Sequence, residues 1–166
     1  MNNSRDVESD AAESHSAENH SVESCDAYRL IEALMQSGKY TETQLDAALA
    51  TAGLSAAKWS VLRQLMAAEG QLPLGQLALR LSCVKSNATQ LVDRLAADRL
   101  VRRVPDPADR RSILAELTAE GRLAHATGLT IVQEFERQLL EDYSPTERVL
   151  LQRLLARLGG FDALCG

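Results

Sequence analysis

The segment VRRVPDPADRRS, residues 101–112, most narrows the folds that this chain can adopt. Four arginines surround a turn with two prolines and two aspartates, and apolar, β-branched sequence stands on both sides of that turn. The pattern predicts two strands, at residues 100–104 and 112–117, joined by a stiff turn. The chain is 45% hydrophobic but only 4% aromatic, which favours helices over a sandwich or barrel. We therefore expect a mainly α protein with a small β-wing.

Helical periodicity occupies the sequence before and after this hairpin. A first helix is predicted from near Asp26, with an interruption at Gly38 and a new start at Thr41, where a capping-box spacing occurs. Helix, tight turn, helix and then hairpin is the order of a winged helix-turn-helix. The helix that restarts at Thr41 is expected to end at Gly53, and the next to run from Ser55 to Gly70. Further helices are predicted after Pro73, over residues 84–98, over some 25 residues from Ala119, and from Ser144, which is followed by Pro145 at the first helical position.

Charge is distributed unevenly along the chain, whose formal net charge is −5. Residues 1–26 hold one base and seven acids, with little apolar sequence, so we expect residues 1–25 to form a disordered acidic tail. Residues 80–111 hold eight bases and four acids. A local basic patch of this kind is the electrostatic signature of a DNA-binding surface.

The predicted helix at residues 84–98 has one apolar stripe and one polar face. The stripe must pack on the core, and the opposite face carries hydrogen-bonding side chains at its start. Amide side chains can pair bidentately with adenine, a lysine can reach guanine or phosphate, and short hydroxyl side chains let the helix approach the bases. An ordinary polar surface is the competing interpretation. The stripe is Val84, Ala88, Leu91, Val92 and Leu95, and the predicted DNA-binding residues are Lys85, Ser86, Asn87, Thr89, Gln90 and Arg94.

The tip of the hairpin is predicted to present its arginines to DNA. Pro105 and Pro107 stiffen it, and Asp109 is placed to accept hydrogen bonds from an arginine or from turn amides, which would stabilise the wing. Arg110 and Arg111 would then be held in a fixed direction, one entering a minor groove and the other binding a phosphate or the aspartate. One of them is expected to be structural and the other functional, with Arg110 as the favoured DNA contact. The alternative is that these arginines only form ion pairs with the neighbouring aspartates.

The run LALRLSCVKSNATQLVDRLAADRLVRR, followed by DPADRRS and LTAEGR, resembles the MarR family of bacterial transcriptional regulators. The Asp-Arg-Arg of the wing is the most specific part of this resemblance. It implies a homodimeric repressor that binds a pseudo-palindromic, double-stranded DNA operator and is released by a small ligand. Residues 54–118 would form the winged helix-turn-helix domain, and residues 26–53 and 119–166 would form dimerisation helices, whose apolar residues cover more than one face.

The same resemblance implies a small aromatic or phenolic effector, bound in a cleft lined by the first, second and fifth helices. The AAKWSVL segment is similar to that of the urate-responsive branch. Ser60 and Gln90 replace an aspartate and an arginine of that branch, which argues against a urate-type effector. The candidate ligand-binding residues are Trp59, Arg63, Met66 and His125, with core packing as the competing interpretation for Trp59 and Met66.

The three cysteines have no CxxC spacing, so they predict neither a disulfide framework nor a zinc site. A redox-sensing regulator of the same fold, acting through Cys25 or Cys165, is one alternative function. A winged-helix protein-interaction module without specific DNA binding is another. Cys83 is expected to be a small buried hydrophobe.

The sequence has no glycine-rich phosphate loop, no paired histidines with metal-ligand spacing and no nucleophile elbow. We therefore predict that the protein is not an enzyme and needs no cofactor or metal. It also has no signal-peptide pattern at its start and no apolar run long enough to cross a bilayer. A cytoplasmic protein without a membrane partner is expected.

Overall fold

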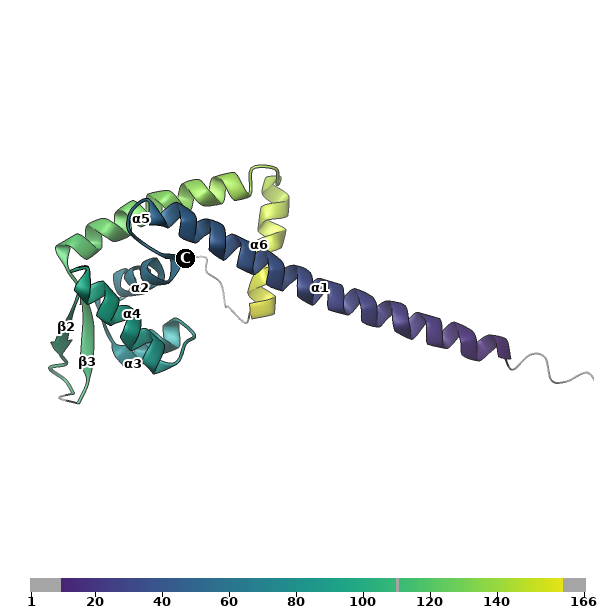
Figure 1. Cartoon of the computed structure of the whole chain (residues 1–166), viewed down its shortest axis with the longest axis horizontal. Coiled ribbons are helices and arrows are strands. Elements are labelled where there is room, and N and C mark those ends of the chain that lie inside the picture. Colours follow the sequence, from purple (N-terminus) through teal and green to yellow (C-terminus); the bar gives the residue numbers. More distant parts are fainter. Residues whose placement is uncertain (1–9, 110, 160–166) are drawn as a thin grey trace, which may run out of the picture. The chain divides into compact units, whose positions relative to one another are not determined.

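The computed structural model describes residues 10–109 and 111–159, with side chains described from Tyr28 onward. The chain divides into two units, Met1–Gln44 and Leu45–Gly166. No helix in the described ranges is long and apolar enough to span a membrane. The elements are α1 (Asp10–Ala50), α2 (Ala56–Met66), β1 (Gln71–Pro73), α3 (Leu74–Arg80), α4 (Lys85–Ala97), β2 (Val101–Pro105), β3 (Ile113–Leu117), α5 (Ala119–Leu139) and α6 (Pro145–Gly159) (Figure 1).

Helix α1 differs from the prediction at its start and in its middle. It begins at Asp10, so residues 10–25, predicted to be disordered, are helical, whereas residues 1–9 lie outside the described residues. Residues 10–37 contain no glycine or proline to stop a helix. The predicted break at Gly38 is also wrong, because Thr41 is inside the helix and its Oγ1 donates to Ser37 O at 2.8 Å. One glycine costs a helix only about 1 kcal/mol, which neighbouring turns can offset.

A three-stranded antiparallel sheet, in the order β1-β3-β2, forms the wing and its base. Strands β2 and β3 lie within a residue of the predicted hairpin, with Val101 opposite Leu117 and Pro105 opposite Ile113. Strand β1 was not predicted, because three residues ending in proline are too short to show a strand period. Leu72 of β1 is nevertheless buried and pairs with Ala115, so β3 is bonded on both edges.

The core of the second unit lies between the sheet and helices α2, α3, α4 and α5. Each helix contributes one apolar stripe, and the largest side chains with almost no exposed surface come from the end of α1 and from α2, α3 and α4. A buried leucine of this kind contributes about 2 kcal/mol by leaving water. These side chains are Leu49, Val61, Leu62, Leu65, Leu77, Val92 and Leu95.

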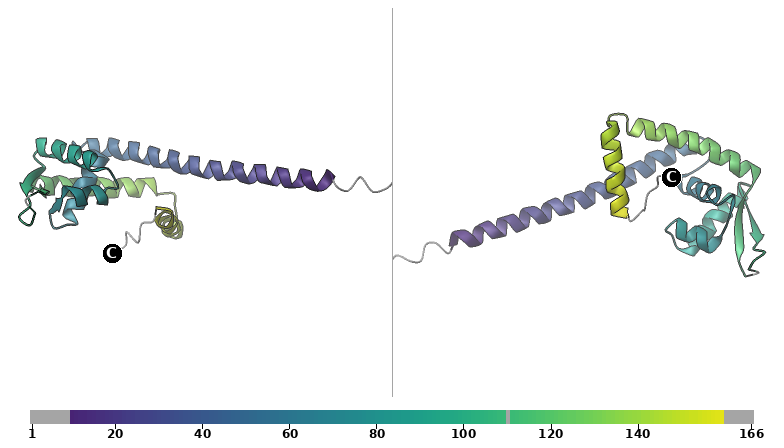
Figure 2. Two further views of the ribbon diagram at one scale, coloured as in Figure 1. Left: turned by 90° about the horizontal axis from the view of Figure 1, so that it is seen from below. Right: turned by 180° about the vertical axis from the view of Figure 1, so that it is seen from behind.

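Hydroxyl side chains begin three of the helices. Ser55 Oγ accepts a hydrogen bond from Lys58 N at 3.2 Å, and Thr118 Oγ1 accepts one from Gly121 N at 2.9 Å. Ser144 and Glu147 form the predicted capping box, with Ser144 N donating to Glu147 Oε2 at 2.8 Å. The predicted starts of α2, α5 and α6 are thus confirmed. Helix α6 leaves the end of α5 at a steep angle (Figure 2).

Candidate nucleic-acid interface

Helix α4 is anchored by one buried face. Ala88, Val92 and Leu95 have no exposed surface, as the apolar stripe predicts, and Leu91 is half-buried. Val84 differs, because 64% of its surface is exposed. Its φ of −69° and ψ of 147° make it the extended residue before the helix, so the helical period that places the others does not apply to it.

The opposite face of α4 presents the predicted polar residues to solvent. Lys85, Ser86, Asn87, Gln90 and Arg94 are all exposed. Thr89 differs, because it is half-buried. Its hydroxyl donates to Lys85 O within the helix at 2.9 Å and so has no proton left to donate to a ligand.

Both arginines of strand β2 have carboxylate partners. Arg102 Nη2 lies 2.6 Å from Glu116 Oε1, across the sheet, and this hydrogen bond lowers the pKa of Glu116. Arg103 Nη1 lies 2.7 Å from Asp93 Oδ1, which links the wing to α4. Neither ion pair was predicted from the sequence. The hairpin register could have revealed the first, because Arg102 and Glu116 are directly opposed in the ladder.

Two aspartates hold the wing turn through backbone amides. Asp106 Oδ1 accepts from Ala108 N, and Asp109 Oδ1 accepts from Arg111 N, both at 2.9 Å. Asp109 thus has one of its two expected roles, since it bonds a turn amide. Arg111 is exposed, whereas Arg110, the favoured DNA contact, lies outside the described residues.

The start of α4 and the wing face a common open groove of about 790 Å³. Its cationic side chains outnumber its single carboxylate, that of Asp109. Figure 1 shows the wing and helices α3 and α4 extending at the same end of this unit. The groove-lining residues that bear charge are Lys85, Arg103, Asp109 and Arg111.

Three of the four predicted ligand-binding residues come together between α2 and α5. The rings of Trp59 and His125 stack with an interplanar angle of 5° and centroids 6.1 Å apart. Arg63 Cζ lies 5.8 Å from the Trp59 ring centroid. Burial, and then the charge of Arg63, lower the pKa of His125. Met66 does not join this cluster, because its Sδ accepts a hydrogen bond from Arg122 Nη1 at 3.7 Å.

Trp59 is 8% exposed, and its Nε1 has no hydrogen-bond partner among the described residues. A Cβ at Gly128 of α5 would overlap the indole ring. Gly128 therefore allows the close approach of α5 to Trp59. This role of Gly128 was not predicted, although a glycine inside a long helical pattern is a sign of close packing.

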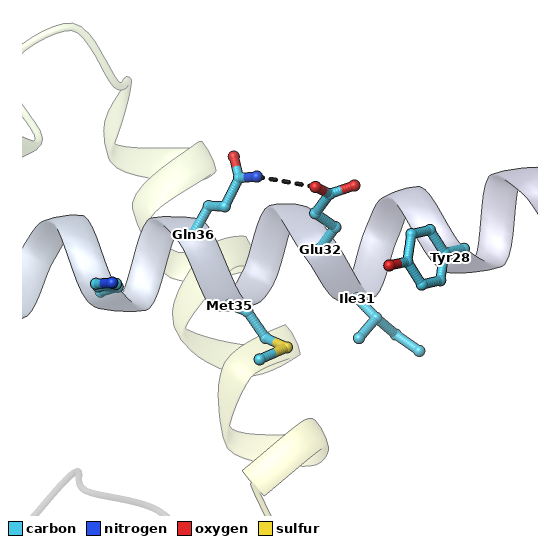
Figure 3. A pocket seen from close by; sticks show the side chains of 6 residues that line it. Tyr28, Ile31, Glu32, Met35 and Gln36 are labelled. Carbon is cyan, nitrogen blue, oxygen red and sulfur yellow. Dashed lines mark hydrogen bonds between the residues drawn. The ribbon is translucent and has the colours of Figure 1, made fainter.

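Apolar side chains are also exposed on α1. Tyr28, Ile31 and Met35 have 71%, 58% and 72% of their surface exposed. Ile31 and Met35 project from one side of the helix, while Glu32 and Gln36 are joined by a 3.1 Å hydrogen bond on the other (Figure 3). They line a shallow surface formed by α1 residues alone. It is a solvent-exposed stripe and not a cavity.

Redox control through Cys25 or Cys165 stays a prediction, because neither of these side chains is among the described residues. Cys83 is a free thiol, half-buried in the turn before α4, where it lines the groove, so its expected full burial is wrong. Among the side chains that the structure describes, no His, Cys, Asp and Glu cluster could hold a metal ion.

A family model described as "MarR family" matches residues 52–112, which include α2, the helix-turn-helix, strand β2 and the wing turn, and end before β3. The HTH-type transcriptional regulator YsmB of Bacillus subtilis, itself uncharacterized, is 33% identical over 89 residues. That match covers 54% of this chain and 61% of YsmB, so the chain spans about three fifths of this curated relative.

Solved structures extend the likeness over most of the chain. A Cys-to-Ser mutant of MarR from E. coli, crystallised with operator DNA, superposes with a TM-score of 0.75 at 24% identity, covering 80% of this chain and 95% of that one. This match shows the winged-helix fold. A probable transcriptional regulator from Pseudomonas aeruginosa is 31% identical, with a TM-score of 0.65 and coverage of 72% and 92%. The chain described here belongs to the MarR family of transcriptional regulators.

Proposed function

We propose that this protein is a homodimeric repressor that binds a pseudo-palindromic operator in double-stranded DNA. DNA binding is supported mainly by the shared groove, where the polar start of α4 and the cationic wing face the same open space. In a winged helix-turn-helix, the second helix enters the major groove and its N-terminal residues meet base edges. The wing is then beside the DNA backbone or in the adjacent minor groove.

The roles of individual residues follow from their positions. Asn87 and Gln90 read bases, since both are exposed amides in the first two turns of α4. These two amides are bordered by Lys85, Ser86 and Thr89. Arg94, near the end of the helix, binds the DNA backbone. On the wing, Arg110 and Arg111 bind DNA, and Asp109 shapes the turn that presents them.

The exposed apolar surface of α6 supports a homodimer. No described residue of this 15-residue helix is buried, which leaves six large aliphatic side chains in water. Such a helix is marginal alone and needs a partner surface. A second copy of this chain is the partner that a two-fold operator requires. The exposed residues are Val149, Leu150, Leu151, Leu154, Leu155 and Leu158.

The cluster of Trp59, Arg63 and His125 supports control by a small aromatic anion, such as a phenolate. It offers the exposed guanidinium of Arg63 and the half-buried ring of His125, which complement a planar ligand and its negative charge, whereas Trp59 is only 8% exposed. Helix α2, which carries Trp59 and Arg63, packs against both α5 and α4. A ligand that moves α2 would therefore change the placement of α4 and release the operator.

The test is a footprint on the DNA flanking the protein's own gene, with affinities measured over a range of salt concentrations. We expect one protected two-fold site, and an affinity that falls steeply as salt rises, with a log–log slope of about −0.9 for each phosphate contacted. Gln90→Ala should cost about 1–3 kcal/mol on that site and leave non-specific binding almost unchanged.

Arg111→Ala is the matched variant, since it should weaken binding to all sequences and reduce the salt slope by about 1. Weak, sequence-independent binding by the parent protein would instead favour a protein-interaction module. A monomer at micromolar concentration in sedimentation experiments would contradict the homodimer.

A further inference from the structure

The residue that begins helix α4 departs from the capping rule that the other long helices of this unit obey. Helices α2, α5 and α6 start with the hydroxyls of Ser55, Thr118 and Ser144, each bonded to a backbone amide. The N-cap residue of helix α4 is Val84, and no side chain in the described part of the chain caps this helix. Valine is among the poorest residues at this position, because it leaves the first amides without an acceptor.

Val84 also gains nothing from burial. Its side chain is 64% exposed, whereas Ala88, one turn further along α4, is completely buried. A single exposed valine is common on protein surfaces and would mean little alone. Here the exposed methyls stand at a position where folding favours a hydroxyl, so neither helix capping nor core packing accounts for the residue. Local departures from folding rules of this kind concentrate at functional sites.

The location of Val84 limits what it can contact when DNA is bound. It directly precedes the exposed residues Lys85, Ser86 and Asn87, at the end of α4 that meets base edges in a helix-turn-helix. Lys85 and Arg111 both line the adjoining groove and favour an anionic partner over an apolar protein surface. In the major groove, the only apolar group on the base edges is the 5-methyl of thymine.

We propose that Val84 is a specificity-determining residue that contacts the 5-methyl group of one thymine in each operator half-site. The inference deepens the proposed DNA-binding function and rests on it. A valine suits this contact because its two methyls are attached at Cβ, with a single stiff torsion, and so stay near the helix axis. Lys85 and Asn87 supply the polar contacts on either side of the methyl.

The test begins with sites that the full-length wild-type protein selects from a random pool of duplex DNA. Each thymine in a selected site is then replaced singly by deoxyuridine, which lacks only the 5-methyl group. At one position in each half-site, we expect the affinity to fall about fourfold, as for one buried methyl group, and about fifteenfold when both half-sites are changed.

Val84→Ser separates base contact from folding. It removes both methyls and adds a capping hydroxyl, so its melting temperature should be equal to or above that of the wild type. Its affinities for the thymine and deoxyuridine sites should be equal. Val84→Ile keeps the methyls and should keep the fourfold preference for thymine. A purely structural role predicts the reverse, a lower melting temperature for Val84→Ser and an unchanged preference.

The outcomes also distinguish a failure of the Val84 contact from a failure of the proposed DNA-binding function. If the wild type selects a defined site but no thymine position responds to deoxyuridine, the Val84 assignment is overturned and the regulator stands. The same holds if Val84→Ser keeps the thymine preference or changes only the oligomeric state. If the wild type selects no site at all, the proposed function itself fails.

Discussion

The contact between Gly128 and Trp59 allows a prediction about stability that can be worked through from the structure. A Cβ at Gly128 would overlap the indole ring, whereas a Cβ at Gly38, also inside a helix, meets nothing within 4 Å. Replacing glycine by alanine in a helix stabilises it by about 1 kcal/mol. An added methyl that must displace a buried side chain costs about 1–3 kcal/mol.

These two effects act together in Gly128→Ala, and only the first acts in Gly38→Ala. We expect Gly38→Ala to raise the free energy of unfolding by about 1 kcal/mol, and Gly128→Ala to lower it by about 1 kcal/mol. The difference between the variants, about 2 kcal/mol, isolates the steric cost because the helix-propensity gain is common to both.

Urea unfolding followed by far-ultraviolet circular dichroism measures both variants in the same way. The chain has a single tryptophan, so the fluorescence of Trp59 gives a second, local signal. In Gly128→Ala the emission should shift toward that of an exposed indole before unfolding. Equal stabilities of the two variants, with unchanged emission, would refute the packing of Trp59 against α5.

Thr118, His125 and Leu154, all in the unit Leu45–Gly166, allow three further predictions. Thr118→Ala should lower the free energy of unfolding by about 1–2 kcal/mol, because Oγ1 both caps α5 and donates to Arg99 O at 2.8 Å, while Thr118→Ser should retain most of it in the same urea assay. His125 has a lowered pKa in the fold, so the unfolded chain binds the extra proton first and stability should fall as pH drops below 6.5. His125→Gln should flatten that fall in melting temperature, and an equal fall in both proteins would contradict it. Leu154→Glu in α6 should turn dimers into monomers in sedimentation experiments, with Glu141→Gln as a matched surface control.

Much of the fold was predictable because its signals are local. The hairpin, the caps at Ser55 and Ser144, and the buried stripe of α4 all depend on residues within a few positions of each other. The strand β1 was not predictable, because its three residues become a strand only through pairing with β3, over forty residues later in the chain.

The candidate site divides in the same way. The exposed polar face of α4 follows from the helical period alone. The prediction for Val84 was wrong because that period does not apply to a residue that precedes the helix. The pairing of Arg103 with Asp93 depends on how the wing packs beside α4, which no local pattern contains. The Trp59 and His125 stack joins residues 66 positions apart, so the sequence could name both residues without showing that their rings meet.

The double pairing of β3 has a consequence for how the molecule would respond to a cut in its backbone. Trypsin cleaves after arginine and prefers exposed loop tips, so Arg111 in the turn should be attacked before Arg102 and Arg103 in the ladder. The fragment that contains β1 and β2 would stay bound to the fragment that contains β3, because β3 pairs with β2 on one edge and with β1 on the other. New chain ends at the wing tip should therefore be tolerated, and the nicked protein should keep its sheet.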